Sequence, residues 1–136
     1  MGYYETLTPT WEYNTRFSEE QLKKLRVEIR EEEKRLHNGQ YITYHFFKLP
    51  TDYAMGDLKF YVDEDMTLTD IETEDGSWHA KYYDAEDAAR LLKEILEEGE
   101  ITLFFDGEDG EKYAVKIRPD EILEGHIQWE WRKLND

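Results

Sequence analysis

The spacing of hydrophobic side chains predicts one clear helix, with Asp84 as its N-cap and a body at about residues 85–98. Five apolar residues fall at helical spacing on one face of this stretch: Ala88, Leu91, Leu92, Ile95 and Leu96. Gly99 follows as a C-terminal stop. The pattern therefore predicts an amphipathic helix that packs its apolar face against a core.

A second helix is predicted at about residues 19–37. Ser18 and Gln21 form a capping box at its start, and Asn38-Gly39 would end it. The apolar stripe of this helix is narrow and is interrupted by Glu32; it consists of Leu22, Leu25, Ile29 and Leu36. A narrow stripe favours a helix that lies on the surface of a sheet.

Elsewhere, apolar and polar residues alternate in short runs, which is typical of β-strands. The expected strands cover residues 40–48, 58–62, 67–73, 77–83, 101–105, 113–117 and 127–131. Short turns join most of them, which implies antiparallel pairing. Pro9 would interrupt any long strand in residues 1–17, so we expect an aromatic arm or a short strand there.

Together these elements predict an α+β fold in a single domain, residues 1–136. We expect a mostly antiparallel, twisted sheet of about six to seven strands with both helices packed on it. No repeat and no long linker divides the chain.

Charge changes this picture, because the net charge is −16 and is unevenly distributed. Residues 1–48 carry 8 acids and 8 bases, whereas residues 49–136 carry 25 acids and 9 bases. Such a field repels nucleic acid and anionic membranes and attracts basic partners. The alternative is that the acidity serves only solubility.

The densest acidic run, residues 63–75, contains seven acids and no base. The seven are Asp63, Glu64, Asp65, Asp70, Glu72, Glu74 and Asp75. On a strand, Asp70 and Glu72 would share a face about 7 Å apart, and a row of carboxylates can imitate phosphates. We therefore expect these residues to bind a basic protein, as a DNA mimic or inhibitor of the anti-defence or immunity type. The alternative is an edge hairpin whose charges prevent association between sheets.

Metal and cofactor chemistry has little support in the residue pattern, and we expect no cofactor, metal site or catalytic residue. One turn is crowded with acids, Asp106, Glu108, Asp109 and Glu111, and calcium is the alternative there, although the spacing is not that of an EF-hand. The histidines are His37, His45, His79 and His126, and they show no zinc-ligand spacing.

One sequence pattern suggests an enzymatic alternative. Pro119-Asp120 followed by Glu130 and Arg132 distantly resembles the Pro-Asp…Glu-x-Lys pattern of metal-dependent nucleases. Arginine replaces the lysine and stays protonated, so it cannot exchange protons as that lysine does. We expect a non-enzymatic protein; a small metal-dependent or acid–base enzyme, or a structural oligomer, is the alternative.

The absence of cysteine excludes disulfides and thiolate metal sites. No run is long enough to cross a membrane as a helix, and no signal peptide is evident, so we expect a cytoplasmic protein. Trp129 and Trp131 alternate on the last expected strand. If that strand lay on a sheet edge, pairing would allow a homodimer.

Overall fold

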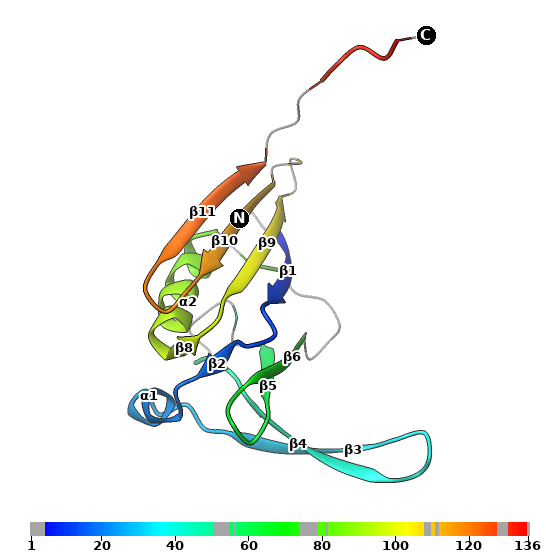
Figure 1. Ribbon diagram of the computed structural model, residues 1–136, viewed down its shortest axis with the longest axis vertical. Coiled ribbons are helices and arrows are strands. Elements are labelled where there is room, and N and C mark those ends of the chain that lie inside the picture. Colours follow the sequence, from blue (N-terminus) through cyan, green and yellow to red (C-terminus); the bar gives the residue numbers. More distant parts are fainter. Residues whose placement is uncertain are drawn as a thin grey trace.

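The computed structural model describes residues 5–50, 55, 57–73, 79–80, 82–107, 110, 112–127 and 131–135. Its strands form antiparallel sheets of five, four and two strands in this described part of the chain (Figure 1). The expected α+β class with mostly antiparallel pairing is confirmed. The expectation of one sheet is corrected, because the strands separate into two large sheets joined by a small one.

The five-stranded sheet has the order β11-β10-β9-β1-β7. These strands are β1 (Glu5–Trp11), β7 (His79–Ala80), β9 (Ile101–Gly107), β10 (Lys112–Ile117) and β11 (Ile122–Ile127). β1 pairs with β9 along its whole length, and Pro9 lies opposite Leu103, so the prediction that Pro9 interrupts a strand is wrong. β7 reaches only Glu5 and Thr6, which leaves an open edge beside Pro9, where a strand tolerates proline.

The four-stranded sheet joins neighbours in chain order, β3-β4-β5-β6. These are β3 (Arg30–Arg35), β4 (Tyr41–Phe47), β5 (Leu58–Val62) and β6 (Leu68–Thr73); the small sheet pairs β2 (Arg16–Phe17) with β8 (Leu96–Glu98). The strands expected at 40–48, 58–62 and 67–73 are therefore present. The hairpin of β3 and β4 extends past the ends of β5 and β6 (Figure 1).

The first helix, α1 (Glu19–Lys24), is much shorter than the expected 19–37. Its start is as predicted, since the Ser18 hydroxyl accepts the Gln21 N–H at 3.2 Å. It ends where Arg26 adopts a left-handed φ of 59°. Residues 30–35 instead pair with the aromatic strand β4, and this pairing outweighs the helix propensity of Glu, Lys and Arg. Gly39, with φ of 86°, belongs to the turn of that hairpin and is not a helix stop.

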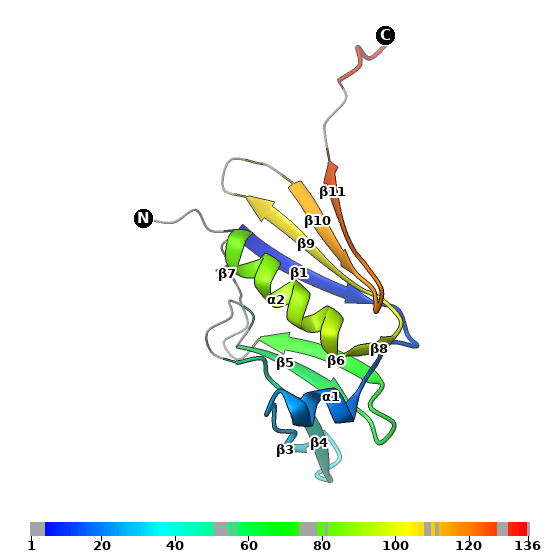
Figure 2. The same cartoon turned by 90° about the vertical axis from the view of Figure 1, so that its left-hand side faces the viewer.

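The second helix, α2 (Tyr82–Ile95), carries the predicted buried face. Ala88, Leu92 and Ile95 are 0% exposed. Two boundaries are corrected: the helix begins before Asp84, which is therefore not its N-cap, and residues 96–98 leave the helix to form β8. Gly99 lies at φ 90° between β8 and β9. Figure 2 shows α2 lying along one face of the five-stranded sheet, with the four-stranded sheet below it.

The strand expected at 127–131 lies mostly outside the described residues, because 128–130 are not among them; Ile127 is the last described residue of β11, and residues 131–135 are not a strand. Trp129 lies outside the described residues, and Trp131 is 89% exposed. Of the strand expected at 77–83, only β7 is described as strand, and Tyr82 already belongs to α2. Residues 77, 78 and 81 lie outside the described residues, and Tyr82 and Tyr83, whose aromatic side chains favour strands, begin α2 instead.

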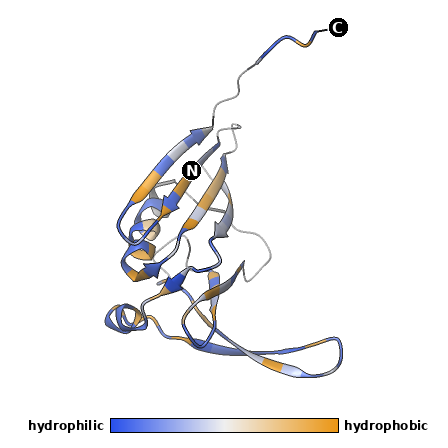
Figure 3. Cartoon of the chain, viewed as in Figure 1, coloured by the Kyte–Doolittle hydropathy of each residue, from blue (hydrophilic) through white to orange (hydrophobic). Residues whose placement is uncertain are grey.

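Buried side chains of both large sheets and of α2 belong to one hydrophobic cluster. Phe17 of β2 lies between the sheets, with its ring 4.9 Å from Phe47 and 6.2 Å from Phe60. Hydrophobic and hydrophilic residues alternate along the strands (Figure 3), as expected for sheets with one buried face. Within the described residues, no helix has the length and apolar character to cross a membrane.

Candidate functional site

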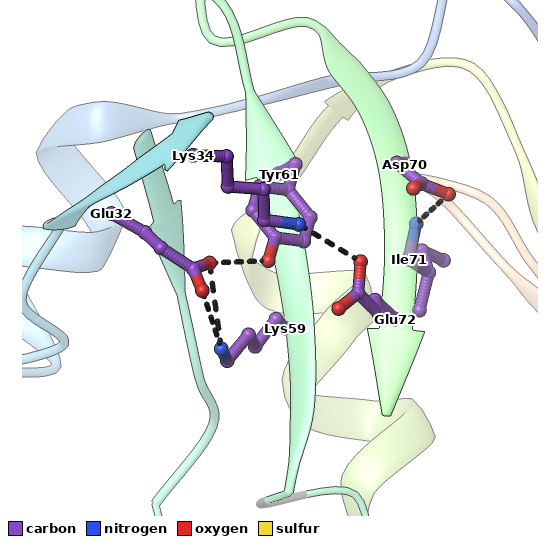
Figure 4. A network of polar contacts seen from close by, with 7 residues as sticks. All are labelled: Glu32, Lys34, Lys59, Tyr61, Asp70, Ile71 and Glu72. Atoms are coloured by element: carbon purple, nitrogen blue, oxygen red, sulfur yellow. Dashed lines mark hydrogen bonds and ion pairs between the residues drawn. The ribbon is translucent and has the colours of Figure 1, made fainter. Parts of the chain in front are cut away.

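The outer face of the four-stranded sheet carries a connected set of charged and aromatic side chains (Figure 4). The strand register places Glu32 opposite Tyr44, Phe46 opposite Tyr61, and Lys59 opposite Glu72. Because side chains alternate between the faces of a sheet, these residues share the face that points away from the core. Strands β3, β5 and β6 therefore each contribute charged residues to one surface, which we call the charged face: Glu32, Lys34, Lys59, Asp70 and Glu72.

Glu32 is the centre of this charged face. The Tyr61 hydroxyl donates to Glu32 Oε2 at 2.6 Å, and Lys59 Nζ lies 3.4 Å from both carboxylate oxygens. The hydrogen bond from Tyr61 lowers the pKa of Glu32, opposed by burial and helped by the charges of Lys59 and Lys34. Burial, followed by the bond to Glu32, raises the pKa of Tyr61 to about 12. Tyr61 is therefore held as a neutral donor, so it is poorly suited to act as a base near pH 7.

Lys34 crosses the same face and joins β3 to β6. Its Nζ lies 3.3 Å from Glu72 Oε2, 4.8 Å from the Tyr61 ring centroid and 5.4 Å from that of Tyr44. Burial acts to lower the pKa of Lys34, but hydrogen bonds with Tyr61 and Glu72 outweigh it and raise the pKa. Lys34 therefore stays charged and neutralises Glu72.

The first three predicted binding residues lie in the turn between β5 and β6. Asp63 shapes this turn, because its Oδ1 accepts the N–H groups of Asp65 at 2.9 Å and Thr67 at 3.0 Å. Met66 completes the turn with a left-handed φ of 66°. Glu64 and Asp65 have no such structural task and are exposed.

Of the other four predicted binding residues, two lie on β6 and two lie outside the described residues. Asp70 and Glu72 share the outer face of β6, as the two-residue spacing predicted. Glu72 is paired with Lys34, whereas Asp70 is exposed and has no cation within 4.0 Å among the described residues. Glu74 and Asp75 lie outside the described residues. The expected row of carboxylates is therefore divided into two groups, one in the turn and one on the outer face of β6. We call three exposed acids of these groups the acidic hairpin: Glu64, Asp65 and Asp70.

Sequence reasoning missed Glu32 and Lys34 because both fell inside the helix expected at 19–37. Two signals were present. Glu32 interrupted the apolar stripe of that helix, and Asn38-Gly39 is a strong hairpin signal when strands flank it. Reading residues 30–35 as the partner of the aromatic strand would have placed both residues opposite Tyr44 and Ile42.

In the part of the chain that the structure describes, no three His, Asp or Glu side chains are grouped in a way that could hold a metal ion. In the acidic turn considered for calcium, Asp106 Oδ1 lies 3.6 Å from Lys112 Nζ, while Glu108, Asp109 and Glu111 are outside the described residues. Asp120 of the nuclease-like pattern is exposed in the turn before β11. Its expected companion Glu130 is likewise not described.

Comparison of the chain with models of protein families, with curated proteins and with solved structures finds no match.

Proposed function

We propose that this chain is a non-enzymatic binding protein that occupies a basic protein surface, with the acidic hairpin at the contact. One observation carries the proposal. Glu64, Asp65 and Asp70 are exposed and have no Lys, Arg or His within 4.0 Å among the described residues, on a hairpin whose 63–75 stretch contains no base. Their negative charge is therefore available to a partner.

The distribution of the bases supports this proposal. Many of them are already within 4.0 Å of a carboxylate of the same chain: Arg16, Lys23, Lys24, Lys34, Lys59, Arg90, Lys112, Lys116 and Arg118. Each of these cations balances a carboxylate of the same chain, and the remaining net charge of −16 makes the field of the molecule negative outward. Such a field accelerates encounter with a basic surface.

A partner that binds nucleic acid fits this chemistry, since its basic channel accepts phosphates and would accept a carboxylate hairpin instead. This chain would inhibit the partner if the acidic hairpin and the nucleic acid compete for the same basic surface. We place this activity in the cytoplasm, since a chain without cysteine needs no oxidising compartment.

The test uses two charge-reversal variants of the full chain. Glu64→Lys/Asp65→Lys/Asp70→Lys changes the acidic hairpin, and Glu28→Lys/Glu33→Lys/Glu94→Lys changes three exposed acids elsewhere by the same total charge. Each immobilised protein is incubated with cell lysate at low and high salt, and retained proteins are identified. We expect wild type and the second variant to retain a basic protein that the hairpin variant loses.

The retained protein is then titrated with the polyanion heparin. Heparin should displace it from the wild-type chain if the hairpin occupies a phosphate-binding surface. Equal loss in both variants would assign binding to the overall field, and equal retention in both would assign the acidity to solubility. Either result would overturn the role given to the acidic hairpin.

A further inference from the structure

Strand β11 is a long and regular edge of the five-stranded sheet. It pairs with β10 over all six of its residues without a shift in register, and no strand of the described residues pairs with its other side. Figures 1 and 2 show it as the outermost strand of that sheet. An edge of this kind can accept a further strand, because its outward backbone N–H and C=O groups form a template for pairing.

The other edges of the two large sheets carry features that oppose such pairing. β7 has only two residues, and the part of β1 that it leaves open contains Pro9. All six residues of β3 are charged, and β6 has an irregular register with β5 as well as Asp70 and Glu72. β11 has no proline, lysine or arginine and no irregularity. Short length, proline, bulges and charge all protect an edge, so β11 is the least protected of these edges.

A second copy of β11 fits this edge best in one register. Opposed residues of an antiparallel pair point to the same face of the sheet, so a twofold axis between identical strands must pass through a residue position. An axis at Glu124 would place two carboxylates opposite each other, which destabilises a sheet. An axis at Gly125 instead places Glu124 of each copy opposite the partner's His126. Residues 123–127 of the two copies are then paired.

This register is complementary in charge and free of obstruction at the axis. Glu124 and His126 lie opposite Val115 and Tyr113, which are buried, so both point to the face of the sheet that α2 covers. Within one copy, His126 Nε2 lies 3.5 Å from Glu124 Oε2, and pairing would add the same kind of contact between copies. Gly125 has no side chain, and a Cβ atom built there would meet nothing within 4 Å.

Helix α2 leaves room beside this edge. A cavity of about 250 Å³ lies between the helix and β11, with Glu86, Ala89 and Arg90 on the helix side and Ile122 and Glu124 on the strand side. The two charges on the helix side balance each other, because Arg90 Nη2 lies 2.7 Å from Glu86 Oε1. A strand placed beside β11 therefore has space for the side chains that it turns toward α2.

We infer that β11 pairs antiparallel with β11 of a second copy of this chain, with Gly125 on the twofold axis. The two five-stranded sheets then form one continuous sheet of ten strands. The assembly is closed, because both copies use the same surface and only the short β7 edges remain at its ends. The interface contains none of Glu64, Asp65 and Asp70, so it is tested independently of the proposed function.

Single cysteine substitutions test the register, since the chain has no cysteine of its own. Opposed residues of an antiparallel pair have Cα atoms about 4.5–5.5 Å apart, a distance that a disulfide bridges. Gly125→Cys places two thiols at the axis, whereas Leu123→Cys places them about 13 Å apart along the strands. Under mild oxidation, Gly125→Cys should form a covalent dimer at least tenfold faster than Leu123→Cys. It should equally outpace Thr43→Cys, at an exposed position of β4.

Sedimentation equilibrium of the full chain, from micromolar to millimolar concentration, tests the dimer itself. We expect wild type to dimerise reversibly and Leu123→Lys, which adds a protective charge to the edge, to weaken dimerisation at least tenfold. Phe104→Lys is the matched control, because Phe104 is 41% exposed and Leu123 43% exposed on the same face, but Phe104 lies on β9 away from the edge. This control should dimerise as wild type does. Circular dichroism checks that each variant is folded.

A charge exchange tests the pairing of Glu124 with the partner's His126. His126→Glu places carboxylates opposite each other and should weaken dimerisation at least tenfold, while Glu124→His/His126→Glu restores opposed acid and imidazole and should restore the dimer. A wild-type chain that is monomeric at every concentration overturns the inference. So does a dimer that Leu123→Lys leaves unchanged, a charge exchange that restores nothing, or crosslinking that is as fast at position 123 or 124 as at 125.

Discussion

Among single residues, Tyr61 determines how charge is held on the charged face. Its hydroxyl group is the shortest polar contact of Glu32, and its ring lies beneath the ammonium group of Lys34. The neutral phenol therefore stabilises a carboxylate on one side and a cation on the other. Loss of its proton would place a third charge between them, where burial makes charge costly.

Tyr61→Phe should lower the free energy of unfolding at pH 7 by about 1–2 kcal/mol, because Glu32 loses a charge-assisted hydrogen bond at a partly exposed site. The pKa of Tyr61 is raised from 10 to about 12 on folding, so its contribution is complete below pH 10 and falls as pH rises toward 12. The stability difference between wild type and Tyr61→Phe should therefore shrink over that range by most of its value at pH 7, about 1–2 kcal/mol.

Urea unfolding at pH 7, 9.5 and 11 measures this difference. Groups that do not contact Tyr61 behave alike in both proteins, so their effects cancel when the two curves are subtracted. Tyr44→Phe is the control, since its ring lies on the same face but carries no bond to Glu32 among the described residues. A difference that stays constant with pH would contradict the role given to the Tyr61 proton.

Among the elements, the turn between β8 and β9 lies in close contact with the backbone at Thr15. Gly99 has a φ of 90°, and a Cβ there would lie 2.4 Å from Thr15 Cα. Thr15 is 0% exposed, and its hydroxyl donates to the Glu100 carbonyl at 3.1 Å and accepts the Glu100 N–H at 3.2 Å. The Thr15 carbonyl also accepts the Leu68 N–H at 2.7 Å, which links this turn to the four-stranded sheet.

Gly99→Ala should therefore lower the free energy of unfolding by about 3–5 kcal/mol, as the sum of a left-handed φ and a clash with backbone. Gly110→Ala is the matched control. Gly110 also has a positive φ, 81°, but nothing lies within 4 Å of a Cβ there, so only the conformational cost of about 1–2 kcal/mol should remain. Denaturant unfolding of both variants checks this, and equal losses would show that the clash is relieved by a shift of Thr15.

The sequence predicted the elements that have a regular hydrophobic periodicity or a local capping signal. These are the buried face of α2, the cap at Ser18 and the alternating strands β9 and β10. Residues 30–35 were not, because Glu, Lys and Arg favour a helix locally and only pairing with β4 makes them a strand. The same error concealed Glu32 and Lys34. The neutralisation of Glu72 could not be predicted either, because Lys34 lies 38 residues away in sequence.

Over the whole molecule, a net charge of −16 opposes compaction, because carboxylates on all sides repel one another. Raising NaCl from 0.01 to 0.15 M shortens the Debye length from about 30 to about 8 Å. We expect the Tm to rise by about 2–5 °C, which corresponds to roughly 1 kcal/mol.

The variant Glu28→Lys/Glu33→Lys/Glu94→Lys is less negative and should show a smaller rise in calorimetric scans at the same two salt concentrations. A Tm that falls with salt in wild type would show that the ion pairs of the described residues stabilise the fold more than the excess acids destabilise it.

The pairing of β1 with β9 has a consequence for synthesis on the ribosome. β3 to β6 can pair as each emerges, whereas β1 emerges first and must wait for residues 101–107. At 5–20 residues per second, β9 follows the completed β6 by about 2–7 s. During that interval β1 is an unpaired strand, the kind of segment that associates wrongly with other chains. Pro9, at its centre, removes one backbone donor, so the waiting strand is a poor template for a foreign strand while its partner is still being made.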